Sequence, residues 1–174
     1  MILLLVVLQI QKYDLGVQTI TLDKKNDDRG HVIEIFREDW KEFFGKDLPS
    51  QINFSESNPG VIRAWHRHNR NQVDYFLVQK GKVRICIYDG NKNSETYGTL
   101  VEINAFGNEP KIIKVPGHFW HGTKNIGTEI SETTYFLTNL YDYNNPDEER
   151  ITWDDKSIID PRTKKPYDWM AIKD

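Results

Sequence analysis

The chain of 174 residues is poor in the features that mark secreted, membrane or nucleic-acid-binding proteins. Its one cysteine, Cys86, excludes a disulfide within the chain, which favours a reducing compartment and a cytoplasmic protein. The 26 acidic and 23 basic residues leave a formal net charge of −3, which gives no electrostatic reason to bind nucleic acid or an acidic membrane. No hydrophobic run is long enough to span a bilayer.

The apolar start of the chain, residues 1–8 (MILLLVVL), lacks the marks of a targeting segment. It has no basic region and no small-residue cleavage site, and the polar residues 9–14 (QIQKYD) follow directly. We expect this segment to form an edge strand or a strand exchanged between two subunits.

Short apolar segments recur at near-regular spacing, and segments rich in Gly, Pro and Asn separate them. Such spacing is typical of a β-sandwich or a β-barrel. The predicted strands cover residues 32–37, 51–57, 61–68, 73–80, 82–89, 99–106, 111–116 and 133–141. Cys86 lies in an alternating strand, which predicts a packed thiol and not a nucleophile.

Helical character is confined to residues 37–47 (REDWKEFFGKD), where Gly45 is the expected stop. From residue 142 onward the chain is polar and carries prolines. We therefore expect a single domain over residues 1–174, with a core over about 15–143 and a tail over 144–174 that wraps around it.

Two histidines, His66 and His68, lie one residue apart in the predicted strand 61–68. Residues i and i+2 of a strand point to the same side, so the two imidazoles share a face. Asp74 lies on the next predicted strand, and His121 follows a Pro-Gly turn. Together they form either a proton-transfer site or a ligand set for Fe, Mn, Ni or Zn.

The spacing of these residues resembles the two signatures of the cupin superfamily. The first signature is matched by Gly60, His66, His68, Asp74 and Gly81, with Asp74 in the place of the usual Glu. The segment PGHFWHGTKN (116–125) resembles the second, with His121 and Asn125 in place. The resemblance implies an all-β fold, the cupin-type double-stranded β-helix or jelly-roll barrel, with short peripheral helices.

The chain also resembles a narrower group, the dTDP-4-dehydrorhamnose 3,5-epimerase family. The matching segments are DDRGHVIEIFR (27–37), QINFSES (51–57), GVIRAWHRH (60–68), VPGHFWHG (115–122) and YDYNNPDEERITWDD (141–155). They occur in the family's order and extend from about residue 15 to 155. That ordering makes the resemblance far more specific than any one motif.

The resemblance implies an epimerase that inverts C3, C5 or both of a dTDP-4-keto-6-deoxyhexose. The protons at these carbons are acidic because they lie α to the ketone, and their removal requires a base, a proton donor and stabilisation of the enolate oxygen. The implied catalytic residues are His66 as base, His121, Tyr143 and Asp174. The implied substrate-binding residues are Arg29, Glu34, Gln51, Asn53, Arg63, His68 and Asp74, with Arg29 and Arg63 on the diphosphate.

The resemblance further implies that catalysis needs no metal or other cofactor, that the partner molecule is the dTDP-sugar, and that the protein is a homodimer. Two positions near the base depart from the family. Asp74 aligns with an enolate-binding lysine, and an ionised carboxylate cannot donate a hydrogen bond to an oxyanion. His68 is a histidine that most of the family lacks.

The acid and the group that orients the base also depart from the family pattern. The family's acid tyrosine aligns near Thr138, with Tyr135, Tyr141 and Tyr143 in the neighbourhood. The orienting aspartate lies in the divergent tail. Asp174, in AIKD, is its match by local sequence, and Asp168, in PYDW, competes with it.

Three other functions remain open. The segment RAWHRH (63–68) also fits a dTDP-sugar 3,4-ketoisomerase. His66, His68, Asp74 and His121 as metal ligands would make a metal-dependent cupin enzyme. A non-catalytic sugar-nucleotide sensor would need the arginines but not the histidine base.

Overall fold

The computed structural model describes residues 8–171 of the chain. The predicted apolar strand of residues 1–8 therefore lies almost wholly outside the described residues, as does Asp174. Within residues 8–171, no helix is long and apolar enough to cross a membrane.

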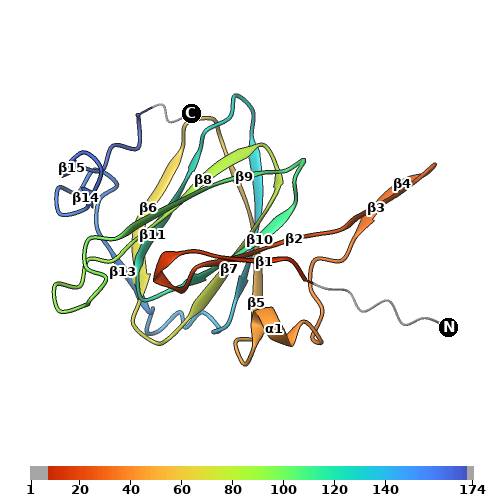
Figure 1. The fold of residues 1–174 in the computed structure, drawn as a ribbon, viewed down its shortest axis with the longest axis horizontal. Coiled ribbons are helices and arrows are strands. Elements are labelled where there is room, and N and C mark those ends of the chain that lie inside the picture. Colours follow the sequence, from red (N-terminus) through yellow and green to blue (C-terminus); the bar gives the residue numbers. More distant parts are fainter. Residues whose placement is uncertain (1–7, 172–174) are drawn as a thin grey trace.

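Two antiparallel sheets face each other and form the body of the molecule (Figure 1). The six-stranded sheet has, in spatial order, β1 (Ile10–Lys12), β2 (Gln18–Thr21), β10 (Lys111–Pro116), β7 (Val73–Lys80), β12 (Ser131–Leu137) and β5 (Gln51–Ser57). The five-stranded sheet has β13 (Glu148–Arg150), β6 (Ile62–His68), β11 (Trp120–Asn125), β8 (Lys82–Tyr88) and β9 (Leu100–Phe106). The prediction of an all-β barrel is confirmed.

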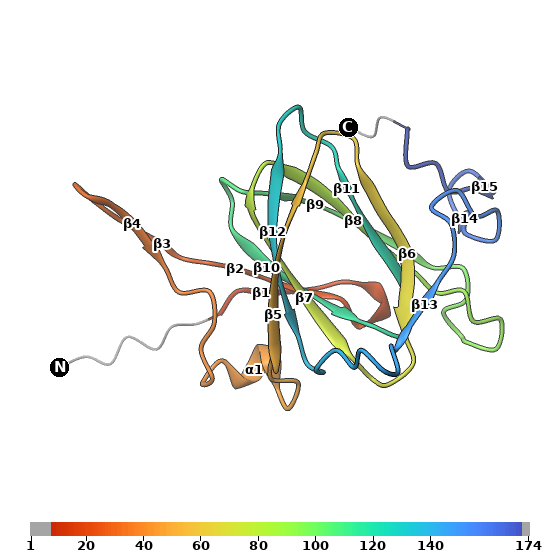
Figure 2. The ribbon, with the colours of Figure 1, turned by 180° about the vertical axis from the view of Figure 1, so that it is seen from behind.

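Smaller elements surround this body. A hairpin of β3 (Lys24–Asp27) and β4 (Gly30–Ile33) projects away from the barrel, as Figures 1 and 2 both show. The predicted helix is a single turn, α1 (Lys41–Phe44), which ends at Gly45 with φ of +59°. The other elements are η1 (Asp14–Gly16), β14 (Ile159–Asp160) and β15 (Lys165–Pro166).

Strand alternation separates an interior from two outer faces. On β7, Tyr75 and Leu77 point outward and belong to an apolar cluster with Phe43 and Phe44 of α1. Phe76 points inward to the apolar cluster between the sheets. That inner cluster consists of Leu15, Val17, Phe76, Val78, Val83, Ile85, Ile87, Val101, Ile103, Ala105, Ile113 and Val115.

The outer face of the five-stranded sheet is covered by the end of the described chain. Ile158, Tyr167 and Trp169 pack there against Trp65 and Cys86, together with further aromatic residues of the sheet. Cys86 is fully buried, as the alternation predicts. Other chain segments thus cover much of each outer face, and the interior between the sheets is a place where polar side chains can meet a ligand.

Gly117 marks a tight approach of two strand connections beside this interior. Its N–H donates to Gln72 O at 2.8 Å, and its carbonyl accepts from His68 N at 2.7 Å. A Cβ atom at this position would lie 2.6 Å from Gln72 O and 2.9 Å from His68 Cδ2. The absence of a side chain is therefore required by the packing.

Gly117→Ala is expected to lower the free energy of unfolding by about 1–3 kcal/mol, because backbone atoms must move to admit the methyl group. Gly127→Ala is the matched control, since a Cβ atom there meets its nearest neighbour at an ordinary 3.4 Å. Thermal unfolding followed by circular dichroism measures both. Equal melting temperatures for the two variants would contradict the packing argument.

Candidate active site

A cavity of about 1060 Å³ opens between the two sheets. Its walls come from β5, β12 and β7 of one sheet and from β6, β11 and β13 of the other, with the segment 139–147 at its rim. The polar or charged residues that line it include Asn53, Ser55, Arg63, His66, His68, Arg70, Gln72, Asp74, Thr123, Tyr135, Tyr141, Asp147, Glu148 and Arg150.

The buried carboxylate of Asp74 is the centre of a hydrogen-bond network at the base of the cavity. Asp74 is 2% exposed, and its Oδ1 accepts from Gln72 Nε2 at 2.6 Å. Its Oδ2 lies 3.0 Å from His121 Nε2 and 3.3 Å from His68 Nε2. Because β7 belongs to one sheet and β6 and β11 to the other, this network joins the two sheets.

His121 is held from both sides of its ring. Its Nδ1 lies 2.9 Å from Phe119 O, and its Nε2 faces the Asp74 carboxylate. Oxygen atoms therefore lie opposite both ring nitrogens and fix the orientation of the ring. The side chain is fully buried and is not among the residues that line the cavity, so it stands behind the wall.

His66 lies on the cavity wall in front of His121. The centroids of the two rings are 4.1 Å apart, and the two residues are directly opposite each other on β6 and β11. Burial, followed by the neighbouring His121, lowers the pKa of His66 well below its usual value, although Asp74 acts in the opposite direction. His66 is therefore a neutral imidazole at neutral pH, which is the state that a general base requires.

Asp74 controls the charge of the histidines beside it. Burial alone would raise the pKa of its carboxyl, but the hydrogen bonds from His121 and His68 outweigh burial and hold that pKa far below its usual value. Burial alone would lower the pKa of His68, and the hydrogen bond and charge of Asp74, with Glu148 and Asp147, outweigh it and raise that pKa. The site thus combines an ionised carboxylate with one neutral base.

Five of the predicted site residues line the cavity together: Asn53, Arg63, His66, His68 and Asp74. Arg63 donates to Ser57 Oγ at 3.0 Å and to Glu56 O at 3.1 Å, which fixes its guanidinium on the β5 side of the cavity. Gln51 lies just outside the lining, where its side chain contacts Asn53 and accepts from Tyr141 N. The roles of these residues stay predictions.

Other predicted residues are not among the side chains that line this cavity. Arg29 is exposed at the tip of the projecting hairpin and pairs with Asp27. Glu34, just after that hairpin, pairs with Lys25 and Arg37. Tyr143 is 86% exposed beyond the end of β12, where strand alternation no longer fixes a direction.

Asp168, the competing candidate for orienting the base, lies between Tyr167 and Trp169. Those two aromatic residues pack on the outer face of the five-stranded sheet, and Asp168 accepts from Met170 N. It is not among the lining residues of the cavity. Asp174 cannot be compared with it, because it lies outside the described residues.

Sequence reasoning left Tyr135 as one of three tyrosines near the acid position, and it missed Gln72 and Arg150 among the polar residues of the cavity. Tyr135 lies on β12, with its hydroxyl 3.1 Å from Ser55 Oγ and its ring edge-on to Phe76. Gln72 donates to Asp74, and Arg150 lies on the short strand β13. Two-residue alternation from buried Thr133 marks Tyr135 as inward-facing, whereas no local pattern identifies β13.

The four residues of the alternative metal set also come together. His66, His68, Asp74 and His121 each offer a ligand atom, and these atoms lie within 4.8 Å of one another. Three imidazoles and one carboxylate suit a divalent transition metal, and the Phe119 carbonyl orients the His121 ring as a second-shell group would. The residues therefore fit an ion as well as a proton network.

Comparison with known proteins agrees with this fold and identifies the family. The sequence profile of the family described as dTDP-4-dehydrorhamnose 3,5-epimerase matches residues 15–162. Over 138 residues the chain is 43% identical to the probable low-salt glycan biosynthesis epimerase Agl13 of Haloferax volcanii, covering 79% of this chain and 87% of that protein. It is 34% identical to the spore coat polysaccharide biosynthesis protein SpsL of Bacillus subtilis, covering 82% and 92%.

Solved structures give the same result. The dTDP-6-deoxy-D-glucose-3,5-epimerase of Legionella pneumophila, in complex with dTDP-4-keto-L-rhamnose, superposes with a TM-score of 0.77 at 25% identity, covering 87% of this chain and 81% of that one. Fold and site together define a cupin-type isomerase. The chain belongs to the dTDP-4-dehydrorhamnose 3,5-epimerase family, and it is a carbohydrate epimerase.

Asp74→Asn is expected to lower the free energy of unfolding by about 3 kcal/mol, because His121 and His68 lose the buried charge that they face. Asp27→Asn is the control. Asp27 also forms an ion pair, with Arg29, but this pair is exposed at the tip of the hairpin. Urea unfolding at neutral pH gives both values. A loss for Asp74→Asn no larger than for the control would show that the network contributes little.

Proposed function

We propose that the protein inverts C3, C5 or both of a dTDP-4-keto-6-deoxyhexose, in a pathway that supplies deoxysugars for cell-surface polysaccharide. The observation that carries this proposal is a neutral histidine on the wall of a large cavity that arginines also line. Membership of the epimerase family supports it, and the names of the relatives from Haloferax and Bacillus support a role in glycan synthesis.

His66 takes the proton from the carbon α to the ketone, and the electron pair of the broken C–H bond forms the enolate. A proton must then return to the opposite face of the same carbon. Tyr135 lies on β12 of the six-stranded sheet, across the cavity from His66 on β6 of the other sheet. We therefore assign the proton donor to Tyr135 in preference to the exposed Tyr143.

Arg63 and Asn53 both line the cavity and can hold the diphosphate or the sugar. Arg29 and Glu34 belong to a projecting arm that does not reach the cavity of its own chain. A homodimer in which this arm contacts a second subunit would give both residues a binding role. The protein acts in the cytoplasm without a cofactor and has no nucleic-acid or membrane partner in this proposal.

Two alternatives concern the same cavity. The close approach of four ligand atoms favours a metal-dependent cupin enzyme as the second candidate. A 3,4-ketoisomerase would also begin with proton removal by a histidine, but it would move the carbonyl to C3. A non-catalytic sensor would bind dTDP and leave the carbon-bound protons in place.

Incubation with a dTDP-4-keto-6-deoxyhexose in D₂O is expected to place deuterium at C3, C5 or both, with the carbonyl still at C4. His66→Asn is expected to slow exchange by at least about 100-fold, because the base is lost. His118→Asn, at an exposed histidine outside the cavity, is the control. Mass spectrometry and NMR of the product measure the label and its position.

Three outcomes of this assay would count against the proposal. A carbonyl at C3 would indicate the ketoisomerase, and activity lost with EDTA and restored by a metal ion would indicate the metal enzyme. Tight dTDP binding without any exchange would indicate the sensor.

The exchange rate is expected to stay constant from about pH 8 down through pH 6.5 and to fall only in more acidic solution. The reason is that the base must be unprotonated, and the pKa of His66 is lowered by burial and by His121. The pH dependence of kcat/KM measures this fall in rate on the acidic side. A half-maximal rate at or above pH 6.5 would rule out a base in this environment.

A further inference from the structure

The proposed reaction forms an enolate, and the residues assigned so far do not stabilise the negative charge on its oxygen. Proton removal by His66 moves negative charge onto the ketone oxygen, and that enolate needs a cation or a strong hydrogen-bond donor. Asp74 stands where the family places a lysine, and both of its oxygens are occupied by Gln72 and His121. His121 lies behind the cavity wall, so it does not reach the substrate. The following inference rests on the proposed function.

The permanent cations of the cavity, within residues 8–171, are Arg63, Arg70 and Arg150, and no lysine lines it. Arg63 is committed to Ser57 and to the carbonyl of Glu56 on the β5 side. Arg70 lies 3.8 Å from Asp147 and is on the loop between β6 and β7. Neither residue is paired in register with His66.

Arg150 is the cation that the sheet places beside the base. β13 pairs with β6 so that Arg150 is directly opposite His66, and His121 is opposite His66 on the other side. Opposite residues of an antiparallel pair project to the same face with Cβ atoms about 5 Å apart. After burial and the two neighbouring histidines, the charge of Arg150 also lowers the pKa of His66, whereas Arg63 and Arg70 are not among the causes.

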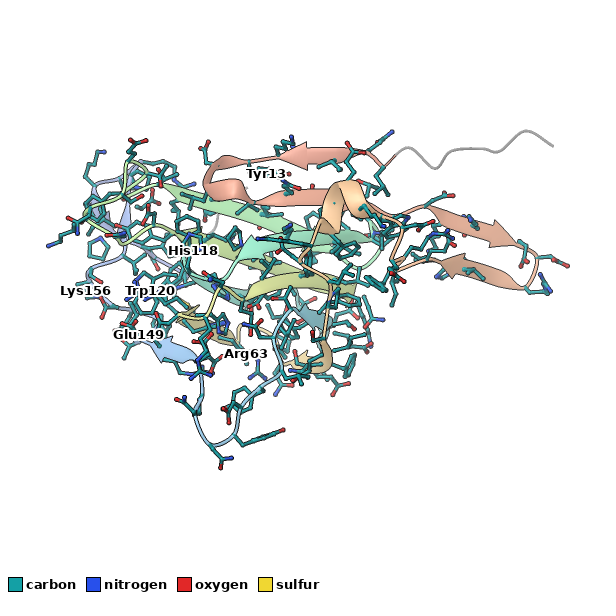
Figure 3. The ribbon with its side chains drawn as sticks, turned by 90° about the horizontal axis from the view of Figure 1, so that it is seen from below. Tyr13, Arg63, His118, Trp120, Glu149 and Lys156 are labelled. Carbon is teal, nitrogen blue, oxygen red and sulfur yellow. The ribbon has the colours of Figure 1, made fainter. Side chains whose placement is uncertain are left out.

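The Arg150 side chain is free enough to reach a ligand. It is 67% exposed and forms an ion pair with Glu148 two residues away. Exposed ion pairs of this kind contribute about 1 kcal/mol or less, so a substrate oxygen can replace the carboxylate. Figure 3 shows Arg63 and Glu149, the neighbour of Arg150 on β13, on the same side of the molecule. Because Arg63 is held on the β5 side, we assign the diphosphate to Arg63 and the ketone to Arg150.

We propose that Arg150 stabilises the enolate, in the role for which the family uses the lysine that Asp74 replaces here. As His66 takes the α proton, the C–H electron pair forms a C=C bond and the C=O π pair moves to oxygen. The Arg150 guanidinium donates an N–H hydrogen bond to that oxygen and keeps its own protons. The carbonyl forms again when a proton returns from the opposite face.

The test compares Arg150→Met and Arg150→Lys with Arg63→Met, a loss of the same group elsewhere in the same cavity. Deuterium exchange gives kcat and KM, and calorimetry gives the dissociation constant of dTDP. Arg150→Met is expected to lower kcat by about 100-fold or more and to change dTDP affinity less than about twofold. Arg150→Lys is expected to recover part of kcat, because it restores the charge.

Arg63→Met is expected to show the reverse pattern, with dTDP bound about tenfold or more weakly and a smaller change in kcat. Exchange at the unmodified rate in Arg150→Met would overturn the inference while leaving the proposed function intact. Weakened dTDP binding with unchanged kcat would also overturn it, because Arg150 would then hold the diphosphate. A lack of exchange in the unmodified protein overturns the proposed function and the inference with it.

Discussion

The contact between the Asp74 carboxylate and His121 holds the catalytic interior together. It joins β7 of one sheet to β11 of the other through two side chains that are almost fully buried. A buried charge at this place is tolerable only because imidazole and amide groups surround it. The same contact holds the His121 ring directly behind His66, where burial and His121 lower the pKa of His66 while Asp74 acts in the opposite direction. This contact therefore bears both on the joining of the two sheets and on the surroundings of His66.

Alternate side chains of each strand point to opposite faces of the sheet, and this alternation separates the interior of the barrel from its outer layers. β7 sends Tyr75 and Leu77 to the outer apolar layer and Asp74 and Phe76 to the interior. The buried apolar residues form the inner cluster and two outer clusters, and α1 and the tail contribute to the outer clusters. The cavity is the part of the interior that this packing leaves to polar groups. The alternation of side chains along the strands thus determines both the shape of the cavity and the polar groups that line it.

The departures from the family pattern form one connected change. Asp74 in the lysine position removes a cation from the cavity wall, and the carboxylate binds His121 and Gln72 instead. A reaction through an enolate then needs its positive charge from another strand. Arg150 on β13 meets that need geometrically, because β13 pairs with the strand of the base. In the proposed role, Arg150 supplies this charge from a position far from Asp74 in the sequence.

The sequence by itself determined the all-β class, most strand boundaries, the shared face of His66 and His68, and the family. These follow from local rules, since alternation, turn residues and ordered motifs are written along the chain. Only the tertiary structure decided that His121 lies behind the wall, that Arg29 and Glu34 lie on a projecting arm, and that Tyr135 and Arg150 line the cavity. Those positions depend on which strands become neighbours, and strand pairing between distant segments has no signature in the residues near each side chain.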